Sequence, residues 1–287
     1  MKIKSTVLIC ISIPFLNCKN ETKESITEIK EKNIDFPTYE LVSDGVSIIV
    51  ESFDSNVVDE NKYNHDNAVF KVGTEFIYTY EHITTENKVQ YFKKTNDSRS
   101  WQFIDQDSLD STEVKTVKIS VADGNPMSEH NPNYNQTNLK YRFDNEIMYS
   151  MSGVIENEAN IWMHPPRSSY FKILEINPFP YIKAPYEIGN KWKWNLKIGD
   201  SWADERWKKW EGSIENKCKY EIINKTKLET KLGELECYVI KSNAKSRIGQ
   251  TELTAFFNEK FGFVKLNYTN IDGTKTNLEL IETNRYL

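Results

Sequence analysis

The clearest fold signal in the chain is Lys219-Tyr220-Glu221-Ile222-Ile223, then a turn at Lys231-Leu232-Gly233, then Leu235-Glu236-Cys237-Tyr238-Val239-Ile240. Both arms alternate polar and apolar residues, which is the period-two pattern of a strand with one buried face. Three more β-rich runs follow at 251–257, 263–268 and 276–281, and the last turn contains Asp272-Gly273, a strong hairpin signal. The C-terminal third is therefore expected to be an antiparallel meander.

The same kind of strand signal continues towards the N-terminus, and no long helical periodicity occurs after residue 36. The upstream runs are 46–50, 75–80, 114–121, 139–143 and 146–150. We predict an all-β, mainly antiparallel fold for residues 36–287, built as a curved sheet or half-barrel.

An internal echo favours two related β units, 36–160 and 161–287. Val72-Gly73-Thr74-Glu75-Phe76-Ile77-Tyr78 and Ile188-Gly189-Asn190-Lys191-Trp192-Lys193-Trp194 share one pattern of Gly and aromatic residues. In each, a Gly that can form a tight turn precedes a strand with two aromatic residues on one face. Duplication and chance similarity in an aromatic-rich chain both remain open.

A proline-rich segment lies between the two units. It runs from Trp162-Met163-His164-Pro165-Pro166-Arg167 through Asn177-Pro178-Phe179-Pro180-Tyr181 to Ala184-Pro185-Tyr186. Proline fixes φ and lacks a donor, so this segment is predicted to be neither a regular helix nor a central strand. We expect an ordered strap laid across the sheet, with the ring of His164 hydrogen-bonded to fix it.

The N-terminus has the layout of a secretory signal peptide. Lys2 and Lys4 precede an uncharged apolar run, Val7 to Leu16, that is too short to span a membrane. The run Phe15-Leu16-Asn17-Cys18 is similar to a lipobox, with Asn17 and Phe15 where small residues and Leu are usual. We predict a signal peptide over 1–17 and lipidation of Cys18, the alternative being a secreted protein in which Cys18 is incidental.

The residues after Cys18 are polar and charged up to about Asp35, so 18–35 is expected to be a flexible tether. Lys19 does not resemble the Asp that retains lipoproteins in the inner membrane. We therefore predict a lipid anchor in the outer membrane, facing either the periplasm or the cell surface.

The charge of the mature chain bears on the class of partner. Removing 1–17 takes away two lysines and no acid, which leaves 35 basic and 42 acidic residues and a net charge of −7. No basic surface is concentrated in the sequence, so we expect no nucleic-acid partner.

The hairpin register would place Cys218 and Cys237 about eight residues apart on one face, so two free thiols are favoured over a disulfide.

Signals for metal, cofactor and nucleophilic chemistry are weak. The four histidines, His65, His82, His130 and His164, show no metal-ligand spacing. No Gly-x-Ser-x-Gly elbow is present. We predict no metal, no cofactor and no catalytic residue.

The most suggestive cluster combines tryptophans with acids. The tryptophans are Trp192, Trp194, Trp202, Trp207 and Trp210, and the acids between them are Asp200, Asp204, Glu205 and Glu211. Indole faces beside carboxylates suit sugar binding, and paired carboxylates could serve glycoside hydrolysis. Aromatic residues at alternate strand positions more often fill a core, and acids near a turn more often sit in water.

The C-terminal pattern also supports a resemblance. Leu232-Gly233-Glu234-Leu235, followed by Phe257-Asn258-Glu259-Lys260-Phe261-Gly262-Phe263-Val264-Lys265, is similar to a broad group of uncharacterised exported bacterial proteins. Trp162 to Arg167 and Asn177 to Tyr181 resemble segments of flavobacterial (Bacteroidetes) lipoproteins. The resemblance implies a curved half-barrel like those of periplasmic lipoprotein carriers and related lipid-binding proteins. It implies no catalytic residue.

Two functional hypotheses follow. The first is a non-enzymatic envelope lipoprotein whose curved sheet binds an apolar ligand, such as a lipid or acyl chain, or an envelope protein partner. The alternative is a glycan-binding or glycan-degrading surface lipoprotein that uses the cluster of tryptophans and carboxylates.

Overall fold

The computed structural model of the chain describes residues 67–95, 100–124, 126, 136–144, 149–157 and 159–285, with the backbone of 38–43 and 46–51. The predicted signal peptide (1–17), Cys18 and the predicted tether (18–35) lie outside these residues. The elements in chain order are β1 (Thr38–Ser43), β2 (Val46–Glu51), β3 (Thr74–Ile83), β4 (Val89–Lys94), β5 (Trp101–Asp105), η1 (Gln106–Ser108), β6 (Thr116–Ala122), β7 (Thr137–Phe143), β8 (Ser150–Glu156), β9 (Asn160–Met163), η3 (Ser169–Ile176), β10 (Tyr181–Lys183), β11 (Lys191–Ile198), η4 (Asp200–Trp202), β12 (Ile214–Thr230), β13 (Gly233–Ser246), β14 (Gly249–Asn258), β15 (Gly262–Thr269) and β16 (Lys275–Arg285).

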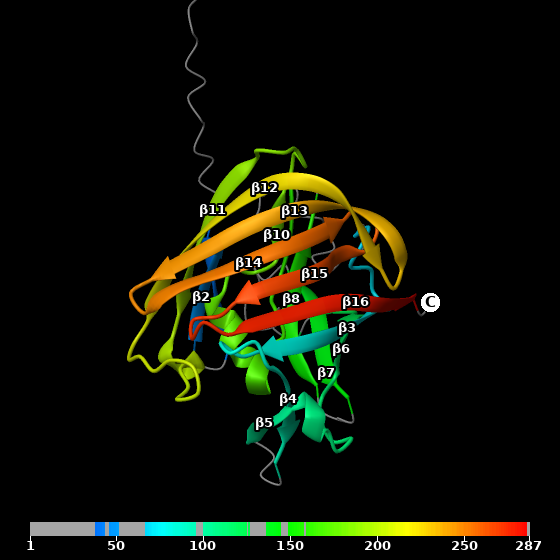
Figure 1. Cartoon of the computed structure of the whole chain (residues 1–287). Helices are drawn as coiled ribbons and strands as arrows, with labels where there is room; N and C mark the ends of the chain where they lie inside the picture. The colour runs from blue at the N-terminus through cyan, green and yellow to red at the C-terminus, as the bar shows by residue number, and fades with distance from the viewer. Residues whose placement is uncertain are drawn as a thin grey trace, which may run out of the picture. The chain divides into compact units, whose positions relative to one another are not determined.

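One antiparallel sheet dominates the unit Phe36–Leu287 and curves into a nearly closed barrel. Its strand order is β10-β9-β8-β7-β6-β3-β16-β15-β14-β13-β12-β11, with the β4–β5 hairpin branching from β3. Figure 1 shows the long strands β11 to β16 sweeping side by side into β3. The prediction of an all-β, antiparallel, curved sheet is confirmed. No helix among the described residues has the length and apolar content needed to cross a membrane.

The C-terminal meander forms as predicted, but its first two strands are longer than the apolar runs indicated. β12 and β13 pair from Lys217 with Lys245 to Thr230 with Gly233. A bulge between Ile222 and Asn224 shifts the register, which lets the ladder bend and continue. Before this bulge the side chains of β12 are alternately buried and exposed, and beyond it most of them are exposed. The alternation of polar and apolar residues in the sequence therefore ends before the strand does.

The cysteine prediction is also confirmed. Cys218 pairs with Ala244, whereas Cys237 pairs with Thr226, eight positions further along β12. Both thiols are free and buried. Desolvation raises the pKa of Cys218 to about 12 and that of Cys237 to about 11, so both are protonated at neutral pH.

Both copies of the internal echo begin a strand of this sheet. Gly73 and Gly189 have φ values of +82° and +95°, a conformation that glycine adopts without steric cost. β3 lies in the middle of the sheet and β11 lies at one end of it. The two aromatic residues of each strand, Phe76 with Tyr78 and Trp192 with Trp194, are all buried.

The proline-rich segment crosses the sheet on its inner face and enters the barrel. Between its prolines it forms the 3-10 helix η3 and then β10, a three-residue strand at the end of the sheet. Phe171 of η3 is fully buried, with its ring centroid 5.0 Å from Tyr80 and 5.3 Å from Phe143. The segment is thus ordered and proline-limited as predicted, but it serves as a plug.

Hydrogen bonds connect the C-terminal end of η3 to the opposite wall of the barrel. The carbonyl of Ile176 accepts from Asn216 Nδ2 at 2.9 Å and from Thr251 Oγ1 at 3.0 Å. Asn177 Nδ2 donates to Asn270 Oδ1 at 3.2 Å. These four side chains are buried, so the hydrogen bonds form away from water.

A second set of polar contacts fixes the N-terminal end of η3. The hydroxyl of Tyr170 lies 2.8 Å from His82 Nδ1 and 2.5 Å from Thr276 Oγ1. The ring of Phe103 stacks on His82, with centroids 4.2 Å apart. Burial lowers the pKa of His82 to about 4, partly opposed by Asp272, so the ring is neutral at pH 7.

A buried ion pair completes the plug. Arg167 Nε lies 3.3 Å from Glu175 Oε1, and both side chains are almost fully buried. The ring of His164, expected to be hydrogen-bonded, lies 4.0 Å from the same oxygen, and its Nδ1 makes no hydrogen bond to a described residue. The backbone of His164 fixes the strap instead, because its N–H donates to Gly153 and its carbonyl accepts from Tyr141.

If the plug is a core element, Phe171→Ala destabilises the protein by about 3–5 kcal/mol, the usual cost of removing a buried phenyl ring. Lys172→Ala is the matched control, since Lys172 lies on the same short helix and is exposed; it should shift stability by less than about 0.5 kcal/mol. Urea unfolding followed by circular dichroism measures both. Equal, small effects would mean that the barrel does not depend on the plug.

The lowered pKa of His82 predicts acid sensitivity. The unfolded ring takes up a proton near pH 6.5, whereas the folded ring resists until about pH 4, so stability is full above pH 6.5 and falls as the pH drops towards 4. His82→Gln cannot titrate and should lose about 3 kcal/mol less over this range than the unaltered protein, since one pKa unit is worth about 1.4 kcal/mol. Parallel urea series at pH 7.5, 6, 5 and 4.5 measure the difference. Identical pH profiles would exclude His82 as the sensitive group.

Candidate functional site

The candidate site lies on the loop 199–213, which joins β11 to β12. Asp200 Oδ2 accepts a hydrogen bond from Gly212 N at 2.7 Å and so closes the base of the loop. Gly212 has φ +65°, which favours glycine at this turn. From the β13–β14 turn, Arg247 donates to the carbonyl of Glu211. The loop is therefore held at both ends.

Arg206 attaches the middle of the loop to the β4–β5 hairpin. Its Nε donates to Asp204 Oδ1 at 2.8 Å, and its Nη2 lies 2.5 Å from Asp204 Oδ2. The guanidinium lies 3.8 Å from the ring centroid of Trp101, and Nη1 donates to the Trp101 carbonyl at 3.3 Å. This one side chain combines a bidentate ion pair with a cation–π contact.

Trp207 packs beside this contact. Its ring stacks on Trp101, with centroids 6.3 Å apart and an interplanar angle of 14°. Its Nε1 donates to the carbonyl of Trp202 at 3.3 Å. Trp202 in turn lies under the guanidinium of Arg167, 4.7 Å from its ring centroid. Aromatic packing therefore links the loop to the plug.

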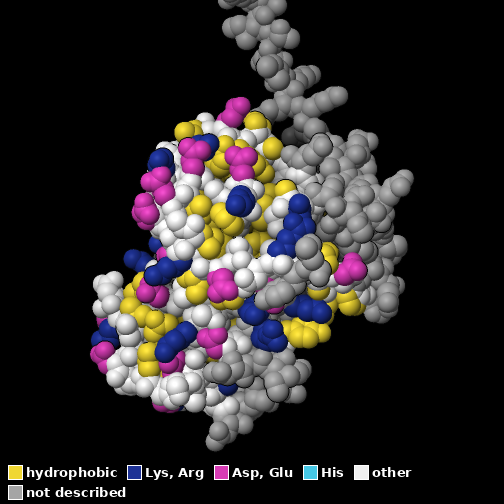
Figure 2. Space-filling model, turned by 90° about the vertical axis from the view of Figure 1, so that its right-hand side faces the viewer, with side chains coloured by type: hydrophobic (Ala, Val, Ile, Leu, Met, Phe, Trp, Pro, Cys, Tyr) yellow, Lys and Arg dark blue, Asp and Glu magenta, His cyan; other side chains and the backbone are white. Residues whose placement is uncertain are grey.

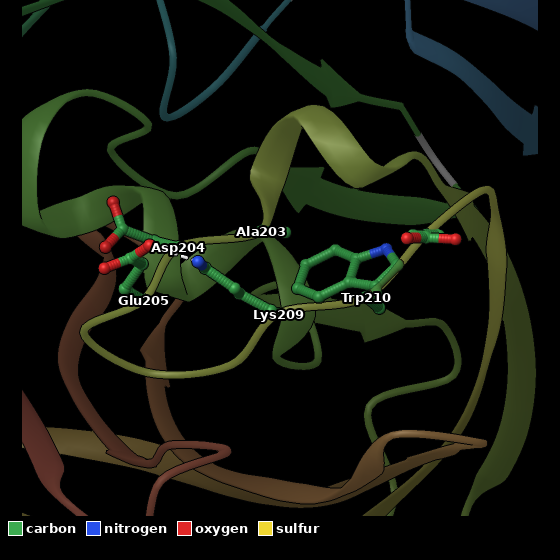
Figure 3. A pocket seen from close by; sticks show the side chains of 6 residues that line it. Ala203, Asp204, Glu205, Lys209 and Trp210 are labelled. Carbon is green, nitrogen blue, oxygen red and sulfur yellow. Dashed lines mark hydrogen bonds and ion pairs between the residues drawn. The ribbon is translucent and has the colours of Figure 1, made fainter.

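A pocket of about 640 Å³ opens on this loop, lined by Ala203, Asp204, Glu205, Lys209, Trp210 and Glu211. In Figure 3 the Lys209 side chain points towards Asp204 and Glu205, and the indole of Trp210 lies on the other side. Trp210 is 8% exposed, and its Nε1 makes no hydrogen bond to a described residue. A buried N–H without a partner is uncommon in folded proteins and calls for an explanation.

The acids of the pocket differ in their partners. Asp204 is paired with Arg206, and Glu205 is paired with Lys209 four residues on. Burial alone would raise the pKa of Asp204, but the hydrogen bonds from Arg206 outweigh it and hold this pKa below its ordinary value. The carboxylate of Glu211 is exposed and has no ion-pair partner among the described residues.

The structure does not bring the five predicted tryptophans together at one surface. Trp192 and Trp194 lie at the end of the sheet, with ring centroids 5.5 and 5.3 Å from Tyr181 of β10. Trp202 and Trp207 belong to the loop itself and are buried. Trp210 is the member of the set that lines the pocket. Asp204, Glu205 and Glu211, noted in the sequence among the tryptophans, line the same pocket, together with Lys209, which the sequence analysis did not single out.

The spacing of residues in the sequence could have indicated both Arg206 and Lys209. Arg206 follows Asp204 by two residues, and Lys209 follows Glu205 by four, separations at which a short loop can form local ion pairs. The partner ring, Trp101, is 105 residues from Arg206 in the chain, so no local pattern could identify it.

Two other kinds of site, for a metal ion and for nucleic acid, lack support among the described residues. No group of three or more His, Cys, Asp or Glu side chains there could hold a metal ion. Figure 2 shows one face on which described Lys and Arg side chains are interspersed with Asp and Glu, without a continuous basic area. Such a face offers no extended site for a phosphate backbone.

Comparisons with known proteins give structural likeness only. The sequence matches no protein-family model and no curated protein. A candidate exported protein with a YmcC-like fold from Bacteroides fragilis is 9% identical, with a TM-score of 0.43 over 75% of this chain and 97% of that one. A candidate lipoprotein from Parabacteroides distasonis is 11% identical, with a TM-score of 0.43 over 77% and 100%. The hypothetical lipoprotein YmcC from Escherichia coli is 7% identical, with a TM-score of 0.32 over 75% and 85%.

Proposed function

We propose that the chain is a lipid-anchored protein of the bacterial outer membrane that binds carbohydrate in the pocket of the 199–213 loop. The observation that carries the binding proposal is Trp210, a nearly buried indole with an unpartnered N–H in a pocket lined with carboxylates and an ammonium group. Anchoring rests on the signal-like N-terminus and on Cys18.

Carbohydrate suits this pocket because a sugar ring has apolar C–H faces and a polar rim. An indole supplies the apolar contact, and its N–H can donate to a ring or hydroxyl oxygen. Carboxylates accept hydrogen bonds from sugar hydroxyl groups, and the ammonium group of Lys209 can donate a hydrogen bond to a sugar oxygen. A rigid loop also lowers the entropy lost on binding, and Asp200, Arg206 and Arg247 hold this one in place.

The interior of the barrel is less suitable for the ligand. An acyl chain would have to occupy space that the plug fills, and Tyr170, Phe171 and Leu174 are at most 1% exposed. Displacing them would also expose Glu175 and break its ion pair with Arg167. We therefore place the ligand on the surface loop.

Binding without catalysis fits the acids of the pocket. Glycoside hydrolysis needs one free carboxylate and one protonated carboxyl group facing each other. Asp204 and Glu205 are instead held in ion pairs with Arg206 and Lys209, and the lowered pKa of Asp204 disfavours a proton donor there. We propose that these two pairs shape the pocket.

A soluble Cys18→Ser protein should bind at least one envelope or plant polysaccharide in isothermal titration calorimetry. Trp210→Ala should weaken that binding at least tenfold, since it removes the indole face and its N–H. Tyr149→Ala is the matched control, because Tyr149 is an aromatic residue that is 50% exposed and does not line the pocket.

Near-UV circular dichroism verifies that the Trp210→Ala protein keeps its tertiary packing. Trp210→Phe provides a second variant, which retains a smaller aromatic ring and loses the donor. The proposal fails if no polysaccharide binds the soluble protein, or if Trp210→Ala binds as tightly as the Tyr149→Ala control.

The anchor is tested separately. Cells grown with radioactive palmitate should label the full-length protein and not a Cys18→Ala variant, because the thiol of Cys18 is the proposed acceptor. Cys10→Ala is the control, since Cys10 lies inside the apolar run and would be removed with it. Label retained by the Cys18→Ala protein would overturn the proposed anchor.

A further inference from the structure

The proposed pocket carries an unbalanced charge that indicates which class of sugar it takes. Its lining contains three carboxylates, Asp204, Glu205 and Glu211, and one ammonium group, Lys209. Arg206 lies outside the lining and neutralises Asp204, while Lys209 neutralises Glu205. Glu211 is left as the one lining carboxylate without a cationic partner among the described residues.

Arg247 contacts the backbone of Glu211 and not its carboxylate. Arg247 Nη2 donates to the main-chain carbonyl of Glu211, and no ion pair joins the two side chains in the described structure. The carboxylate of Glu211 is exposed, so it can meet a ligand without first giving up another partner. A ligand ammonium group would supply the missing charge through a charge-assisted hydrogen bond.

Trp210 adds a second, independent feature that favours a cation. Its side chain is more than nine-tenths buried, and it lines the pocket. The face of an indole carries partial negative charge and attracts ammonium groups. The same ring can therefore support a sugar face and stabilise a positive charge carried on it.

We infer that the pocket prefers a carbohydrate bearing free, protonated amino groups, and that Glu211 determines this preference. The inference rests on the proposed carbohydrate binding and specifies the ligand of the same site. Neutral sugars would still use the indole face, whereas uronic-acid polymers would meet Glu211 as a like charge. The net negative charge of the chain acts in the same direction at longer range.

The test compares three probes of equal length on the soluble Cys18→Ser protein: a glucosamine oligomer, its N-acetylated counterpart and a galacturonate oligomer. At a pH where the glucosamine amines are protonated, the glucosamine oligomer should bind at least tenfold more tightly than the acetylated one, and the galacturonate oligomer should bind most weakly. Raising the salt concentration should reduce the preference, because the contact is ionic and partly exposed.

Glu211→Gln isolates the residue. It removes the charge and keeps the size of the side chain, so the ratio of the affinities for the glucosamine and acetylated oligomers should fall to near unity, whatever happens to the affinity for the acetylated oligomer. Glu215→Gln is the matched control: Glu215 is exposed at the start of β12, is paired with Lys217 and lies outside the pocket. It removes one negative charge from the same region and should leave the preference unchanged.

The outcomes separate the two proposals. If the acetylated and glucosamine oligomers bind equally and Glu211→Gln changes neither affinity, the charge inference is wrong and carbohydrate binding stands. If the Glu215→Gln protein loses its preference for the glucosamine oligomer to the same extent, the preference comes from the overall charge of the region and not from Glu211. That result would also overturn the inference. If no carbohydrate of any charge binds, the proposed function itself fails.

Discussion

The packing of η3 against both walls of the barrel is the contact on which the rest of the structure depends. A curved sheet of this size must bury its concave face, and here a segment of the chain itself does so. Phe171 packs on the aromatic residues of β3, β4 and β7, while the carbonyl of Ile176 accepts hydrogen bonds from β12 and β14. The plug therefore links strands that are distant in sheet order.

The sheet opens between β10 and β11. β10 and β11 follow one another in the chain but lie at opposite ends of the strand order, so the seam falls between them. No ladder joins their described residues, and aromatic packing takes its place: Tyr181 contacts Trp192, Trp194 and Tyr220. Tryptophans that the sequence presents as a candidate binding surface are thus used largely to seal the barrel.

The candidate site illustrates how a rigid frame positions a loop. The 199–213 loop is held by Arg247 on one side and by the contact of Arg206 with Trp101 on the other. Its two ion pairs and the neighbouring aromatic residues leave an indole and one unpaired carboxylate facing a pocket. Binding functions are commonly carried by loops on a stable scaffold, because the sheet supplies the stability and the loop is free to vary.

The sequence by itself determined the local features of this protein. Alternation of polar and apolar residues specified antiparallel strands, Gly73 and Gly189 specified turns, and the hairpin register kept Cys218 apart from Cys237. These depend on neighbours in the chain or on one strand pair. Only the tertiary structure decided that the strap enters the barrel, that the sheet nearly closes, and which tryptophan lines a pocket. Each of those outcomes rests on contacts between residues far apart in the chain, such as Arg206 with Trp101, and no local pattern encodes such a pairing.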